Sequence, residues 1–219
     1  MTAEGGAPLI LPAQAVPAVR LPLGALALPL AALLGARLWA QHRLKQQAPL
    51  QAPARGWPSV VSWFLIFVAL IGAALLAAAR GELTPARYAL GFALVLPSLA
   101  LRAAALRAIG GWYHEGIAVR VGQQVVREGV YRRLRHPLHL ALLVEMAGLA
   151  TWAGSALPWA GVLLALGIAL ARNHGEERAM LRALGAPYRA YLAGPAWDLV
   201  DLLPGRRRPD DEDEAVRAA

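Results

Sequence analysis

Five long apolar runs constrain this chain more than any other feature of its sequence. A helix needs about 20 predominantly apolar residues to cross about 30 Å of hydrocarbon. Four of the runs approach that length, and the fifth is shorter but continues into polar sequence with helical spacing. The runs cover Leu21–Ala40, Pro58–Ala79, Ala86–Ile109, Pro137–Leu157 and Pro158–Ala171. The sequence therefore predicts an all-α, polytopic membrane protein with about five transmembrane helices.

Composition and charge agree with that prediction. The chain is 58% hydrophobic and 16% charged, whereas soluble domains carry about 25% charged residues. Loops rich and poor in Lys and Arg alternate between the runs, which predicts an N-terminus outside and a C-terminus in the cytoplasm, for example across a bacterial inner membrane. The net charge of +8 thus reflects topology. It does not indicate a nucleic-acid partner, which would need a soluble basic face with interleaved aromatic side chains.

The chain divides into three predicted parts. Residues 1–56 hold an accessory transmembrane helix and a Pro/Ala-rich loop, residues 57–204 form the membrane core, and residues 205–219 form a charged tail that we expect to be disordered. The last two runs predict a helical hairpin. The second of them should continue as a cytoplasmic helix until Gly185 and Pro187, which form a stop signal.

The stretch "GVYRRLRHPLHL" places basic residues at the start of the fourth run. Because Pro is favoured in the first turn of a helix, His136 should be the cap and Pro137 the first helical residue. The free N–H groups and the helix dipole at that point favour an anion, and Arg135, His136 and His139 add donors around it. The alternative is that the neighbouring arginines only hold the membrane edge.

The stretch "RNHGEER" forms a second polar cluster where the fifth run ends. Arg172 and Glu176 stand four residues apart and share one helix face. As an exposed ion pair they would contribute only about 0.3–0.5 kcal/mol. The functional interpretation is that they bind a zwitterion or an acid at the lipid boundary.

A metal site is not expected in this chain. His136, His139, His174 and Glu177 could act as metal ligands. However, the sequence has only five His residues, no HExxH motif and no cysteine. It also lacks a glycine-rich phosphate loop after a predicted strand, which argues against a Rossmann-type cofactor domain.

Two charged residues lie inside the apolar runs. Glu145 comes eight residues after Pro137, which places it about 12 Å along the helix, and Arg102 should lie at a similar depth. An ionised side chain at that depth costs about 2.5–3.5 kcal/mol. The sequence therefore predicts that Arg102 and Glu145 contact each other.

Taken together, "GVYRRLRHPLHL" and the later "RNHGEERAMLRALGAPYRAYL" resemble the isoprenylcysteine carboxyl methyltransferase family and its phospholipid methyltransferase relatives. The resemblance covers residues 106–192. It implies an integral membrane enzyme that binds S-adenosylmethionine on the cytoplasmic side. Two positions depart from the family pattern, because His139 stands where Tyr is usual and Ala141 stands where Gly is usual.

The resemblance also implies roles for individual residues. Arg172 and Glu176 are the expected catalytic residues, with Arg172 facing the substrate, while Tyr188 and Tyr191 belong to the pattern without an assigned role. The residue chemistry agrees, since His136 suits the carboxylate of the cofactor and Glu176 suits its ammonium. The expected cofactor-binding residues are Gln123, Gln124, Val125, Val126, Tyr131, Arg135, His136, Pro137, Leu138, His139, Glu176 and Glu177.

The methyl acceptor stays open at this point. A carboxylate needs only Arg172 to hold it, whereas a phenol or thiol must lose a proton, for which His139 or His174 could serve. As the methyl acceptor we favour a lipophilic small molecule over a lipidated protein. We expect the enzyme to be in contact with membrane lipid. Two alternatives are an NADPH-dependent membrane reductase of the sterol-reductase type and a non-enzymatic membrane scaffold that retains the fold.

Overall fold

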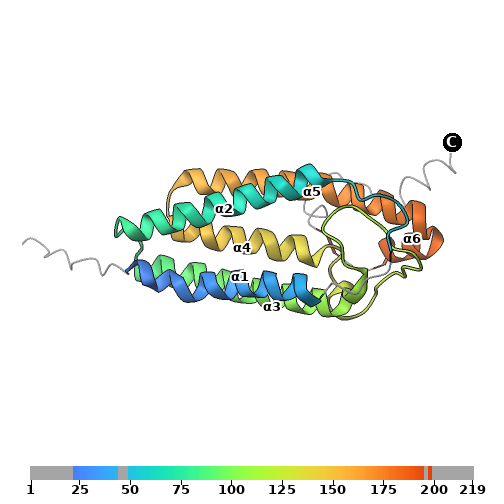
Figure 1. The fold of residues 1–219 in the computed structure, drawn as a ribbon, viewed down its shortest axis with the longest axis horizontal. Helices are drawn as coiled ribbons and strands as arrows, with labels where there is room; N and C mark the ends of the chain where they lie inside the picture. The colour runs from blue at the N-terminus through green and yellow to red at the C-terminus, as the bar shows by residue number, and fades with distance from the viewer. Residues whose placement is uncertain (1–21, 44–48, 195–196, 199–219) are drawn as a thin grey trace, which may run out of the picture.

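The computed structural model describes residues 22–43, 49–194 and 197–198 of the 219-residue chain. Five helices lie side by side along the long axis of the molecule, while loops and a short sixth helix gather at one end (Figure 1). This confirms the all-α prediction. The elements are η1 (Leu23–Leu26), α1 (Ala27–Arg43), α2 (Trp57–Ala79), α3 (Pro85–Ile109), η2 (Gly110–Trp112), η3 (Gly129–Arg132), α4 (Pro137–Ala153), α5 (Ala156–Leu184) and α6 (Ala186–Leu192).

Each predicted apolar run contains a helix, but one boundary differs from the prediction. The turn of the α4–α5 hairpin lies at Gly154, whose φ of 71° ends α4, so α5 begins before Pro158. Pro158 does not break α5, because a helix tolerates proline in its first turn. Among the described residues three helices are long and apolar enough to cross a membrane, namely α2, α3 with η2, and α5, while α1 and α4 contain shorter apolar segments.

Helix α4 lies at the centre of the bundle and is buried along most of its length. Its closest neighbour is α3, and glycines bring the two backbones together. A Cβ atom added at Gly91 would lie 2.2 Å from Nε1 of Trp152, and one added at Gly148 would lie 2.7 Å from Cγ2 of Val95. The start of α4, which carries the His-Pro step, is therefore held on a tightly packed helix pair.

The predicted contact between Arg102 and Glu145 is confirmed. Nε of Arg102 donates to Oε1 of Glu145 at 2.7 Å, and Nη2 donates to Oε2 at 3.0 Å. Both residues are buried, with 8% and 0% of their surface exposed. This bidentate ion pair joins α3 to α4 inside the bundle.

Two loops pair with each other over one end of the bundle. The connection between α1 and α2 forms isolated antiparallel bridges from Leu50 to Arg120 and from Arg55 to Ile117. The stretch around Ile117 therefore makes bridges without forming a regular strand in the described part. A parallel bridge joins Leu134 to Trp197, and the predicted disordered tail lies outside the described residues.

Candidate functional site

A cavity of about 610 Å³ lies at the loop end of the bundle. Its polar part is lined by Arg172 and by nearly the whole set expected to bind the cofactor. Glu177 is the exception, because it lies behind His136 and does not line the cavity. The lining residues from the expected set are Gln123, Gln124, Val125, Val126, Tyr131, Arg135, His136, Pro137, Leu138, His139 and Glu176.

The other part of the cavity is apolar and runs between the helices. Its wall includes Leu34, Val60, Phe64, Phe67, Val68, Ile71, Leu106 and Leu142. Phe64 is 64% exposed and Val68 is 48% exposed, so this wall reaches the outer surface of α2. The cavity therefore joins a charged interior to the apolar outer face of the bundle.

His136 caps α4, as predicted, and meets two carboxylates from α5. Its Nδ1 lies 3.6 Å from Oε2 of Glu176, and its Nε2 lies 3.4 Å from Oε1 of Glu177. Burial lowers the pKa of His136, but the two carboxylates more than compensate and raise this pKa to about 9. His136 is therefore protonated at neutral pH, and the start of α4 meets the polar half of α5 at these ion pairs.

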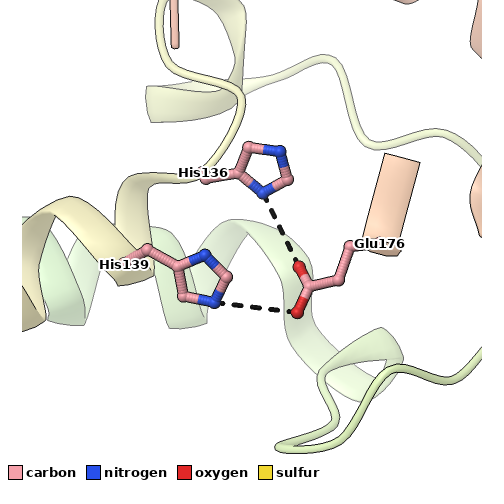
Figure 2. A group of neighbouring side chains, drawn as sticks. All are labelled: His136, His139 and Glu176. Carbon is pink, nitrogen blue, oxygen red and sulfur yellow. Dashed lines mark ion pairs between the residues drawn. The ribbon is translucent and has the colours of Figure 1, made fainter. Parts of the chain in front are cut away.

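His139 lies one turn further along α4 and faces the same carboxylate. Figure 2 shows Glu176 reaching toward both histidines, with Nε2 of His139 at 3.7 Å from Oε1 of Glu176. The two imidazole rings are nearly parallel, with centroids 5.5 Å apart. The Trp63 ring of α2 packs against the His139 ring, with the ring centroids 4.9 Å apart.

Arg172 is buried and makes contacts to three other segments. Its Nε lies 2.8 Å from Oε1 of Glu176, so the pair is not an exposed surface contact but part of the cavity wall. Its Nη1 donates to Oγ of Ser59 at 2.8 Å and to the carbonyl of Gly56, while Nη2 donates to the carbonyl of Glu115. The guanidinium also lies over the Trp63 ring. Arg172 therefore ties α5 to the loops that cover the cavity.

Helix α6 closes the cavity from the C-terminal side. Tyr188 and Tyr191 both line it, and the hydroxyl of Tyr191 donates to the carbonyl of Tyr131 at 2.9 Å. Behind this wall, Nη2 of Arg135 donates to the carbonyl of Leu192 at 3.1 Å. Burial raises the pKa of Tyr188, and that of Tyr191 to about 12, so both phenols stay neutral.

Three residues near the site had no predicted role. Trp63 lies within an apolar run that gives it no distinguishing mark. Asn173 contacts both Asp198 and His139. It lies 25 residues from Asp198 and 34 residues from His139 in the sequence, so no local sequence pattern links these residues. By contrast, His174 is exposed and Ala141 is buried outside the cavity lining.

The donor set fits a zwitterion of the expected cofactor's size. The carboxylate of Glu176 suits an ammonium, while protonated His136 and the free N–H groups at the start of α4 suit a carboxylate. The cavity volume lies within the range of about 300–1,000 Å³ typical of small-molecule pockets.

A metal ion would have to use the same groups. The ligand atoms of His136, His139 and Glu176 lie within 4.8 Å of one another, as do those of His136, Glu177 and Asp198. Since His136 holds its proton between two carboxylates, a cation there would have to displace that proton. The absence of a metal stays a prediction.

No curated protein matches the chain. Residues 89–182 match the model of the Isoprenylcysteine carboxyl methyltransferase (ICMT) family, a family of methyltransferases. The match runs from α3 into the polar half of α5 and includes the whole loop that lines the cavity. The resemblance carried by the two sequence motifs is thus confirmed: this part of the chain is similar to isoprenylcysteine carboxyl methyltransferases.

Proposed function

We propose that the protein transfers a methyl group from S-adenosylmethionine to a lipophilic acceptor at the cytoplasmic surface of a membrane. The observation that carries this proposal is the two-part cavity. Its polar part holds the contact between His136 and Glu176, and its apolar part reaches the outer face of α2. A charged cofactor from water and an acceptor from lipid could therefore meet in one cavity.

The methionine portion of the cofactor supports the assignment of the polar part. Its ammonium and carboxylate are attached to the same carbon, so their protein partners should be neighbours. Glu176 and His136 approach to 3.6 Å and carry opposite charges, as this requires. Gln123 and Gln124 add polar groups to the cavity wall, and Val125, Val126 and Leu138 add apolar surface.

When bound, the cofactor supplies a methyl group activated by a positively charged sulfur. The task of the protein is then to hold the acceptor in line with that methyl, since positioning alone can supply several kcal/mol of a barrier. Arg172, which pairs with Glu176, lies over the Trp63 ring, where the polar and apolar walls meet. These residues therefore border the place where the acceptor would react.

The test is cofactor binding to the full chain purified in detergent. We expect S-adenosylmethionine to bind the wild type and Glu82→Gln, a carboxylate change in the exposed α2–α3 connection, but not Glu176→Ala. Transfer of labelled methyl from the cofactor to a total lipid extract should follow the same pattern. Binding of NADPH in place of S-adenosylmethionine, or of neither cofactor, would overturn the proposal.

A further inference from the structure

A buried chain of hydrogen bonds fixes the proton on one nitrogen of His139. Nδ2 of Asn173 donates to Oδ1 of Asp198 at 2.9 Å, so the carbonyl oxygen of Asn173 must point the other way. That oxygen contacts Nδ1 of His139 and can only accept a hydrogen bond. Nδ1 therefore carries the proton of a neutral ring, and Nε2 presents a lone pair.

The lone pair of Nε2 faces the cavity without a hydrogen-bond donor from the described part of the chain. Opposite it lies Oε1 of Glu176 at 3.7 Å, which is also an acceptor. Two acceptors that face each other call for a donor between them, such as an O–H or S–H group. Three cations, Arg135, His136 and Arg172, already balance the three carboxylates of Glu176, Glu177 and Asp198, so the site does not call for a further charge on His139.

Arg172, in turn, is poorly placed to hold an acceptor carboxylate. A guanidinium has five N–H donors; Nη1 and Nη2 of Arg172 donate to Gly56, Ser59 and Glu115. Its Nε makes an ion pair with Glu176 at 2.8 Å without a hydrogen bond in the described residues. A bidentate carboxylate contact requires two neighbouring N–H groups. Binding an acid would therefore break contacts that hold the loops over the cavity.

We propose that His139 is the general base for a protic acceptor, and that the acceptor is a lipophilic phenol or thiol. This inference rests on the proposed function. Nε2 of His139 takes the proton of the O–H or S–H group, and the electron pair left on the oxygen or sulfur forms the new bond to the methyl carbon. The bond from that carbon to the sulfonium breaks, its electrons stay on the cofactor sulfur, and the imidazolium later releases the proton to water. Asn173 and Asp198 are positioning residues that hold the ring in this tautomer, as a carboxylate or amide does in hydrolase triads.

The competing interpretation is that Asn173 and Asp198 only attach the C-terminal segment to α5. Two methyl acceptors distinguish these two interpretations in one experiment. An alkylphenol has a pKa of about 10, like tyrosine, and needs a base at neutral pH, whereas its nitro-substituted analogue is already ionised. The variants are His139→Gln and the matched His174→Gln, which changes an exposed histidine on the same side of the membrane that does not line the cavity.

We expect His139→Gln to lower kcat/KM for the alkylphenol by about 10²–10⁴, with little loss for the ionised nitrophenol. His174→Gln should lower neither. Equal losses for the two phenols would show a structural role and overturn the proposal. So would a wild type that methylates a long-chain carboxylic acid but neither a lipophilic phenol nor a thiol.

Two measurements do not depend on turnover. Binding of S-adenosylmethionine to the wild type separates failure of this inference from failure of the proposed function, in which the wild type itself would not bind the cofactor. A chromogenic nitrophenol added below its pKa should show the phenolate absorption band with the wild type and with Asn173→Asp. The band should be lost with His139→Gln and weakened with Asn173→Leu. A band of equal strength in all four proteins would exclude His139 as the base.

Discussion

The ion pair between Arg102 and Glu145 allows a quantitative test of the bundle. Glu145→Gln keeps the shape of the side chain but removes its charge, and Arg102 is only 8% exposed, so its charge would stay buried without compensation. Removing one partner of a buried pair costs about 3–5 kcal/mol. At roughly 2–4 °C per kcal/mol for a chain of this size, the apparent Tm in detergent should fall by about 6–20 °C.

The assay is thermal unfolding of the purified protein at constant detergent and salt concentration. The double variant Arg102→Met, Glu145→Leu removes both charges and should regain most of the lost Tm, because a matched apolar pair often replaces a buried ion pair without penalty. A coupling energy close to zero in this double-mutant cycle, or an unchanged Tm for Glu145→Gln, would refute the reasoning that the pair is buried and mutually compensated.

Three further predictions concern pH, packing and orientation. The pKa of His136 is raised to about 9 from 6.5. Its proton therefore stabilises the fold fully below pH 6.5, and this contribution is lost as the pH rises through 9. The unfolding midpoints at pH 6 and pH 10 should differ more for the wild type than for His136→Asn. Gly91→Ala places a Cβ 2.2 Å from Trp152 and should cost about 1–3 kcal/mol, whereas Gly72→Ala, with nothing within 4 Å, should be neutral or stabilising in the same unfolding assay. Because the chain has no cysteine, single variants Glu82→Cys and Arg132→Cys can be labelled in intact cells with a thiol reagent that does not cross the membrane. Labelling of Arg132→Cys without labelling of Glu82→Cys would contradict the predicted orientation.

Much of the framework could be predicted from the sequence because each signal was local. Apolar runs near 20 residues long predict helices directly, and the His-Pro step predicts the start of α4 to the residue. The contact between Arg102 and Glu145 followed from a single energetic argument, since two opposite charges at similar depth in lipid must compensate each other.

The parts that could not be predicted depend on tertiary packing. The fourth apolar run extends to Leu157, four residues beyond the last residue of α4, because apolar residues continue after the turn at Gly154 and hydropathy alone gives no boundary there. The contacts of Arg172 come from Gly56 just before α2, from α2 itself, from α5 and from the loop after α3. Asn173 could be seen only as part of a polar stretch, although its orientation decides which nitrogen of His139 holds the proton.

The position of α2 in the cavity wall has a consequence for how such an enzyme could change its substrate. Trp63, Phe64, Phe67 and Val68 all line the apolar part, and all precede the segment that matches the family. The groups assigned to the methyl donor lie within that segment. Under the proposed function, exchange of this one helix for another of different shape would change the acceptor and leave the groups assigned to the methyl donor unchanged.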